Sequence, residues 1–197
     1  MKKELRAGQI YLLKHLDPHV RQDADVRILE YMKGSEIVNK SLNIMIYVSL
    51  PSEVDTRGLL EYLLCSGKNI SVPAVEGDHI AAVRVRSLES LKPGKFGVFE
   101  PQLEHREYVE PRELDLVILP GLCFTEDGKR LGRGGGFYDR FLKLIPDSVH
   151  TIGLCYGAQV GQEIPFEEHD MNVDEIVTED GSAGNTAAGI EIKKEEK

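Results

Sequence analysis

The sequence predicts an α/β fold: a single three-layer domain with a mostly parallel central sheet flanked by helices. Short apolar runs of strand length alternate with longer segments of helical periodicity, which is the pattern of strands joined through helices. The run from Leu114 to Leu119 is apolar almost throughout, as expected for a parallel strand covered on both faces. A chain of 197 residues is long enough for one such domain with a sizeable core.

The expected helices are marked by apolar residues at helical spacing and by the residues that end each pattern. They cover residues 2–16, 20–32, 52–66 and 137–144. Asp17 and Pro18 end the first pattern, and Gly34 ends the second. The third is expected to begin at about Ser52, with acidic residues in its first turn, and to end before Gly67.

The expected strands are short apolar runs bounded by turn-forming residues. They cover residues 44–48, 69–72, 80–85, 114–119, 151–156 and 175–177. Pro73 is expected to end the second strand, and alternation over 80–85 indicates a half-exposed one. Ligand-binding loops in such sheets leave the carboxyl ends of strands, and a glycine-rich segment follows Leu119 directly.

The composition indicates an acidic enzyme with a locally basic binding site. A net charge of −9 argues against sequence-independent nucleic-acid binding, although a basic loop could still attract an anionic substrate. No apolar run reaches membrane-spanning length, and the N-terminus lacks a hydrophobic signal core, so we expect a cytoplasmic monomer without membrane contact. The domain is expected to cover residues 1–180, and the polar segment 181–197 is expected to be a disordered tail.

The three cysteines predict neither a disulfide framework nor a structural zinc site. Cys65, Cys123 and Cys155 are widely spaced and form no Cys-x-x-Cys pair. Each has apolar neighbours in the sequence, so all three are expected to be buried and inert.

The segment from Leu119 to Arg140 carries the strongest functional signal in the chain. It holds two arginines, Arg130 and Arg133, and a run of glycines, and it leads into Phe-Tyr-Asp-Arg at an expected helix start. Glycines expose backbone N–H groups to a ligand, and guanidinium groups bind phosphate oxygens in forked pairs, so the segment predicts a site for a phosphorylated ligand. A glycine-rich hairpin with solvated arginines is the alternative, but it would not explain the aromatic pair and the carboxylate that follow.

The two common phosphate-binding patterns do not fit this segment. The P-loop pattern requires Gly-Lys-Ser or Gly-Lys-Thr, whereas Gly132 is followed by Arg133. The dinucleotide-binding pattern would place its last glycine at Phe137. The sequence therefore supports neither standard nucleotide-binding fold.

Arg-Leu-Gly-Arg-Gly-Gly-Gly-Phe-Tyr-Asp-Arg, after Leu-Pro-Gly-Leu-Cys-Phe, resembles the signature of the 5-formyltetrahydrofolate cyclo-ligase family, also called methenyltetrahydrofolate synthetases. Other segments agree with the family in order and spacing, so the resemblance extends over nearly the whole chain up to about Asp180. They are residues 2–6, 47–56, 96–101, 164–165, 169–170 and 173–180.

The resemblance implies an ATP-dependent conversion of 5-formyltetrahydrofolate to 5,10-methenyltetrahydrofolate, with release of ADP and phosphate. The formyl oxygen of an amide is a poor leaving group, and its phosphorylation would allow the 10-position nitrogen to close the ring. The protein would then have to hold a triphosphate, a Mg²⁺ ion and a flat folate ring in one cleft.

The resemblance also implies a role for individual residues. It implies catalytic roles for Arg133 and Tyr138. ATP contacts fall on Lys2, Lys3, Arg6, Arg130, Gly132, Arg133, Gly134, Gly135, Gly136, Phe137 and Tyr138. Folate contacts fall on Val48, Glu53 and Tyr138, and the Mg²⁺ ligands would be Asp139 and Asp174. Some members of the family carry lysine in place of Gly135, which leaves more of the phosphate contact to Arg133.

Each of these residues also has an ordinary structural interpretation. The basic N-terminal residues could form a solvated helix face, Asp139 could cap a helix, and Asp174 could be a surface acid. Glu53 could simply be a negative charge at a helix N-terminus, where the helix dipole stabilises it. His169 and Asp170, which are consecutive in the sequence, are best interpreted as part of a structural loop rather than as a catalytic dyad. Two other functions remain open: a diverged family member with another substrate, related to a group linked to thiamin metabolism, and a non-catalytic folate or nucleotide sensor.

Overall fold

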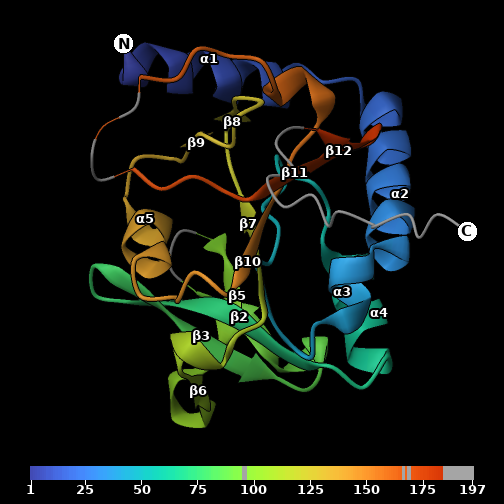
Figure 1. Cartoon of the computed structure of the whole chain (residues 1–197), viewed down its shortest axis with the longest axis vertical. Helices are drawn as coiled ribbons and strands as arrows, with labels where there is room; N and C mark the ends of the chain where they lie inside the picture. Colours follow the sequence, from blue (N-terminus) through green and yellow to red (C-terminus); the bar gives the residue numbers. More distant parts are fainter. Residues whose placement is uncertain (95–96, 166, 168–169, 184–197) are drawn as a thin grey trace, which may run out of the picture.

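An eight-stranded sheet runs through the middle of the part of the chain described by the computed structural model, in the order β12-β11-β10-β7-β1-β2-β3-β6 (Figure 1). The structure describes residues 1–94, 97–165, 167 and 170–183. The five strands from β11 to β2 are parallel, whereas β12, β3 and β6 are antiparallel to their neighbours. The predicted mostly parallel α/β sheet is confirmed.

The elements have the following bounds. The helices are α1 (Lys2–His15), α2 (Pro18–Gly34), α3 (Glu36–Lys40), α4 (Arg57–Cys65) and α5 (Phe137–Leu142). The strands of the large sheet are β1 (Asn43–Ile46), β2 (Asn69–Glu76), β3 (His79–Val85), β6 (Tyr108–Val109), β7 (Leu116–Pro120), β10 (His150–Leu154), β11 (Glu175–Thr178) and β12 (Gly181–Ala183). Two small sheets consist of β4 (Leu91–Pro93) with β5 (Phe99–Pro101), and of β8 (Cys123–Phe124) with β9 (Arg130–Leu131).

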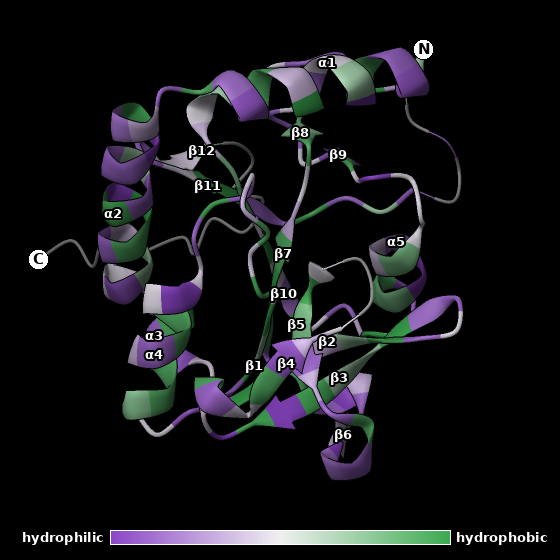
Figure 2. Cartoon of the chain, turned by 180° about the vertical axis from the view of Figure 1, so that it is seen from behind, coloured by the Kyte–Doolittle hydropathy of each residue, from purple (hydrophilic) through white to green (hydrophobic). Residues whose placement is uncertain are grey.

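Alternate side chains of the central strands face two separate apolar cores, which gives the three layers. In β7, Leu116 and Ile118 pack with residues of α2 and α4, whereas Val117 and Leu119 pack with residues of α5. All four are completely buried, as expected for a parallel strand with helices on both faces. Figure 2 shows the hydrophobic colour concentrated in the central strands, while the outer helices carry both colours.

Two predicted boundaries were wrong. The helix expected from Ser52 begins only at Arg57, because the preceding side chains bond to their own backbone: Glu53 Oε2 accepts from Leu50 N at 2.9 Å, and Asp55 Oδ1 accepts from Arg57 N at 2.9 Å. The strand expected to end at Pro73 continues through it. β2 pairs with β1 only as far as Ser71, so Pro73 has a single neighbouring strand, β3, and proline is tolerated there.

The C-terminal part of the sheet extends past the expected domain boundary. Gly181–Ala183 forms β12, antiparallel to β11, so these three residues belong to the sheet and not to a disordered tail. Residues 184–197, the rest of the expected tail, lie outside the described residues. Among the described helices, none is long and apolar enough to cross a membrane.

The predicted burial of the cysteines is confirmed for Cys123 and Cys155 and wrong for Cys65. Cys123 and Cys155 are buried, and burial raises the pKa of the Cys123 thiol to about 11. Cys65 is exposed, because it is the last residue of α4 and its apolar sequence neighbours turn to the core side of the helix.

An ion pair between β10 and β11 makes part of the stability depend on pH. His150 Nε2 lies 3.4 Å from Glu175 Oε2, and this contact raises the pKa of His150 above 6.5 and lowers the pKa of Glu175 below 4.5. The histidine contribution is complete below pH 6.5 and is lost as the pH rises through its folded-state pKa. The glutamate contribution is complete above pH 4.5 and is lost as the pH falls through its folded-state pKa.

The His150→Gln variant should therefore differ most from the parent protein between pH 4.5 and 6.5 and least at alkaline pH. Urea unfolding of both proteins at several pH values measures this difference. A destabilisation that stayed constant from pH 5 to about pH 9 would show that the loss of packing, rather than the charge pair, causes the effect.

Candidate active site

The site lies where the strand order of the sheet reverses. From β1 the chain continues to β2 on one side, and from β7 it continues to β10 on the other, while β1 and β7 are neighbours. The loops that leave the carboxyl ends of two such strands diverge and leave a crevice between them. Here one loop carries Val48 and Glu53, and the other carries the glycine-rich segment.

The larger of two adjoining cavities fills this crevice and is mainly apolar. It has a volume of about 500 Å³, within the range of small-molecule sites. The strands contribute Pro73, Val75 and Ile80, and the loop after β1 contributes Tyr47, Val48, Leu50 and Glu53. The glycine-rich segment closes the opposite side with Gly132, Arg133, Gly134, Gly135, Gly136, Phe137 and Tyr138. A flat ring with polar edges fits such a lining.

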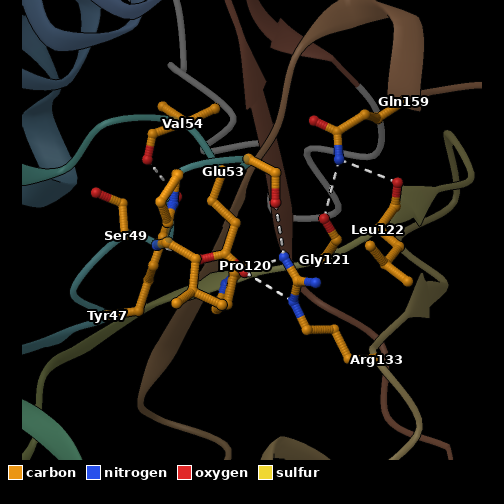
Figure 3. A network of polar contacts seen from close by, with 12 residues as sticks. Tyr47, Ser49, Glu53, Val54, Pro120, Gly121, Leu122, Arg133 and Gln159 are labelled. Carbon is orange, nitrogen blue, oxygen red and sulfur yellow. Dashed lines mark hydrogen bonds and ion pairs between the residues drawn. The ribbon is translucent and has the colours of Figure 1, made fainter. Parts of the chain in front are cut away.

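Glycine is required at several positions of this region, either by the backbone conformation or by the lack of space for a Cβ atom. Gly136, at the N-terminus of α5, has a φ of +66°, a left-handed conformation that favours glycine. At Gly121, which follows β7, a Cβ atom would lie 2.5 Å from the ring of Phe124. Gln159 holds the same turn by donating to the carbonyls of Gly121 at 2.9 Å and Leu122 at 3.0 Å (Figure 3).

Arg133 and Glu53 meet across the mouth of the larger cavity. Arg133 donates from Nε and from one terminal nitrogen to Glu53 Oε1, both at 3.1 Å, and that nitrogen also donates to Ser52 Oγ at 3.0 Å (Figure 3). Glu53 Oε2 accepts from Leu50 N, so the carboxylate accepts three bonds of the roughly four it can take. A ligand could donate the fourth hydrogen bond to this carboxylate. If Arg133 turned toward an anion, both acceptor positions of Oε1 would become free for the ligand.

Arg130 lies beneath the glycine-rich segment and holds Asp139. Its side chain is only 3% exposed, and it donates to Asp139 Oδ1 at 2.9 Å and to the Pro120 carbonyl at 3.3 Å. Its guanidinium carbon also lies 5.5 Å from the centre of the Tyr138 ring. Asp139 lines both cavities, so Arg130 fixes a carboxylate at the place where the cavities adjoin.

Tyr138 supplies a protonated hydroxyl to the larger cavity. Burial, with a smaller effect from the Glu53 charge, raises the pKa of the Tyr138 phenol well above its usual value. The hydroxyl therefore stays neutral and remains a hydrogen-bond donor to a ligand.

The smaller cavity is strongly polar and has a volume of about 280 Å³. It is lined by Lys2 and Arg6 of α1, by Asp139, and by Glu167 and Asp170. Arg6 Nε donates to the Gly132 carbonyl at 3.0 Å, and Lys2 Nζ lies 2.6 Å from Asp170 Oδ2. These contacts bring α1 against the glycine-rich segment and place two cations beside it.

Most of the predicted site residues therefore come together, but two do not. Lys3 is exposed and lines neither cavity. Asp174 also lines neither cavity, and its Oδ2 accepts from Thr151 N at 2.8 Å and Thr151 Oγ1 at 2.7 Å. Thus the structure does not bring Asp174 together with Asp139.

Sequence reasoning missed several members of the site. Asp170 was interpreted as part of a structural loop, yet it lines the smaller cavity; its neighbour His169 lies outside the described residues. Pro73, Val75 and Ile80 come from β2 and β3, and the sequence pattern of this region gave no sign of a ligand contact. The sequence contained a signal for Asp170, namely its family-like spacing, but none for these strand residues.

The chemistry of the carboxylates near the glycine-rich segment suits Mg²⁺. Magnesium is commonly bound by one or two carboxylates together with phosphate oxygens and waters. Asp139 and Asp170 line the same cavity, next to backbone and cationic groups that suit phosphate. Among the described residues there is no cluster of three or more His, Cys, Asp or Glu side chains that could hold a metal ion without further ligands.

Together, the fold and the site define a three-layer α/β protein in which a mainly apolar cavity and a polar, charged cavity share a glycine-rich wall. The chain belongs to the 5-formyltetrahydrofolate cyclo-ligase family, a family of ligases whose model matches residues 1–179. The mouse 5-formyltetrahydrofolate cyclo-ligase is 31% identical and aligns with 92% of this chain and 95% of its own length. The Escherichia coli K12 5-formyltetrahydrofolate cyclo-ligase is 28% identical, with 83% and 92% covered.

A solved structure supports the same relationship. The NMR structure of Aquifex aeolicus 5,10-methenyltetrahydrofolate synthetase superposes with a TM-score of 0.82 at 32% sequence identity. The match covers 93% of this chain and 92% of that one. The family resemblance and the fold predicted from the sequence are therefore confirmed.

Proposed function

We propose that this protein converts 5-formyltetrahydrofolate and ATP to 5,10-methenyltetrahydrofolate, ADP and phosphate. The observation that carries the proposal is the wall shared by the two cavities, to which Arg130, Gly132, Gly134, Gly136 and Asp139 all contribute. A folate ring in the larger cavity and a triphosphate in the smaller one would meet at this wall. Phosphoryl transfer requires the terminal phosphate and the formyl oxygen to meet at these shared residues.

Each side of the wall contributes to the reaction. The apolar lining excludes water from the formyl group, and Glu53 accepts hydrogen bonds from the N–H groups of the pterin. Lys2, Arg6 and Arg133 neutralise the phosphates, while backbone N–H groups of the glycines donate to them. Once the formyl oxygen has taken the terminal phosphoryl group and ADP has left, the 10-position nitrogen attacks the same carbon. This nitrogen loses its proton to solvent or to the departing phosphate, and the C–O bond breaks to release phosphate.

Asp139 and Asp170, which line the same cavity, would hold Mg²⁺. The ion supplies charge neutralisation to the triphosphate during transfer. Arg130 holds the Asp139 carboxylate at the shared wall through the 2.9 Å contact. We place the protein in the cytoplasm as a monomer that binds neither nucleic acid nor membrane, in line with its net charge of −9.

One assay tests the proposed function. The purified protein is mixed with 5-formyltetrahydrofolate and MgATP, and the near-ultraviolet absorbance of the methenyl product is followed. We expect product to form only when both substrates are present. Absence of product with well-folded protein would exclude the cyclo-ligase activity and favour another substrate or a binding role.

Arg133→Ala should impair the use of ATP far more than folding. The side chain is 42% exposed, so its removal costs little packing, whereas loss of a charge-assisted phosphate contact should raise KM for ATP by about tenfold to 100-fold. Arg133→Lys retains the charge without the fork and should be intermediate. Steady-state kinetics and thermal melting measure the two effects, and near-normal turnover with parent-like melting would exclude this role for Arg133.

A further inference from the structure

The segment that carries Glu53 is held in place by residues outside the two cavities that adjoin at the glycine-rich wall. Residues 50–56 are irregular, and side chains from α2 and from the end of β10 satisfy several of their backbone polar groups. We call Arg21, Asp25 and Tyr156 the loop clamp. None of the three lines the larger or the smaller of the cavities at the glycine-rich wall. Arg21 and Asp25 instead line a third cavity, together with Pro51 and Ser52.

Arg21 makes the central contacts of the loop clamp. One terminal nitrogen donates to the carbonyls of Pro51 and of Glu53, the latter at 2.9 Å. Its Nε donates to the Tyr156 hydroxyl at 3.0 Å, and its guanidinium carbon lies 5.7 Å from the centre of the Tyr156 ring. Arg21 therefore fixes the backbone on both sides of Ser52, immediately before the Glu53 side chain leaves the loop.

Asp25 and Tyr156 hold the other end of the same segment. Asp25 Oδ1 accepts from Asp55 N at 3.0 Å and from the Tyr156 hydroxyl at 2.8 Å. That hydroxyl also lies 3.1 Å from the Glu53 carbonyl. Burial raises the pKa of Asp25 and that of Tyr156, so both groups sit in a desolvated place where hydrogen bonds are strong.

The loop clamp has a direct geometric consequence for the larger cavity. Glu53 Oε2 accepts from Leu50 N, and Glu53 N donates to the Leu50 carbonyl at 2.9 Å, so side chain and backbone of Glu53 form one tight turn. Arg21 of the loop clamp, which does not line the larger cavity, donates to the backbone carbonyl of Glu53. A shift of the turn would move the carboxylate relative to the cavity and to Arg133.

We propose that the loop clamp positions the Glu53 carboxylate for the folate substrate. The proposal rests on the proposed function and adds Arg21, Asp25 and Tyr156 to it as positioning residues. Their hydrogen bonds end at the loop after β1, and none is made to the glycine-rich segment, so they should affect the folate side of the site more than the ATP side.

Steady-state kinetics of Arg21→Ala and Tyr156→Phe test the proposal. We expect KM for 5-formyltetrahydrofolate to rise about tenfold or more and KM for ATP to stay within about twofold. KM does not depend on the fraction of folded enzyme, so this separation distinguishes positioning from general destabilisation. Equal changes in both KM values, or none in either, would overturn the proposal.

Two comparisons sharpen the test. Arg27→Ala is the matched control, because Arg27 lies on the same helix, is half-exposed, and pairs with Asp180 rather than with the loop. It should leave both KM values unchanged. Asp25→Asn keeps the oxygen that accepts both bonds and should retain a near-parental KM for the folate, whereas Asp25→Ala should not.

Hydrogen exchange separates failure of the loop clamp from failure of the proposed function. In the free protein, Asp25→Ala should accelerate exchange of the amides of Leu50, Glu53 and Asp55, and Asp25→Asn should not. This result does not depend on any substrate. Parent-like exchange in the alanine variant would overturn the loop clamp, whereas absence of product with the parent protein would overturn the proposed function instead.

Discussion

Asp139→Ala should destabilise the protein by about 3 kcal/mol and also abolish formation of the methenyl product. The loss of stability follows from Arg130, whose side chain is 3% exposed and has Asp139 as its carboxylate partner at 2.9 Å. Removal of one member of a buried ion pair leaves an uncompensated charge in a place of low polarity. The loss of activity follows from the proposed contact of Asp139 with Mg²⁺ at the shared wall.

A second substitution separates these two effects. In the double variant Arg130→Met/Asp139→Ala the uncompensated charge is gone, so most of the lost stability should return. Activity should not return, because no carboxylate remains at position 139. Asp147→Ala, at an exposed acid after α5, is the matched control and should change neither property. Recovery of activity in the double variant would show that Asp139 serves only to neutralise Arg130.

Glu53→Gln should raise KM for 5-formyltetrahydrofolate by about 100-fold. Hydrogen bonds to a charged acceptor contribute about 1.5–3 kcal/mol, and every 1.4 kcal/mol corresponds to a factor of ten. The glutamine is nearly isosteric, but its amide cannot form the ion pair with Arg133 and accepts through only one oxygen. The rise in KM therefore comes from the loss of the negative charge and of one acceptor oxygen, and the melting temperature should change little.

Titration with the folate ligand in the absence of ATP measures this effect directly. Glu61→Gln, at an exposed acid of α4 outside both cavities, should bind like the parent protein. An unchanged affinity of Glu53→Gln would mean that the carboxylate serves the loop and Arg133 but not the ligand.

The central sheet could be predicted from the sequence, because its signals are local. The apolar run from Leu114 to Leu119 overlaps with β7, in which Leu116 to Leu119 are completely buried. The short elements could not be predicted in this way. β9, with only Arg130 and Leu131, exists because it pairs with β8, and β12 exists because β11 offers an edge. Such pairings depend on tertiary contacts rather than on periodicity.

The candidate site can likewise be divided into residues that the local sequence identifies and contacts that only the folded structure reveals. The glycines and Arg133 could be identified from chemistry that is concentrated in one segment of the sequence. The ion pairs could not, because Glu53 and Arg133 are 80 positions apart, and Lys2 and Asp170 are 168 apart. Arg130 was expected at the phosphates, and its additional role of holding Asp139 depends on burial, which no residue pattern around it reveals.

The most direct test of the shared wall is a crystal structure with 5-formyltetrahydrofolate and a non-hydrolysable ATP analogue bound together. We predict that the pterin will lie in the larger cavity against Glu53 and Tyr138. The terminal phosphate should lie at Gly132–Gly136, within reach of the formyl oxygen and between Arg133 and Asp139. A nucleotide bound elsewhere, with its terminal phosphate separated from the formyl group by the glycine-rich segment, would contradict the account.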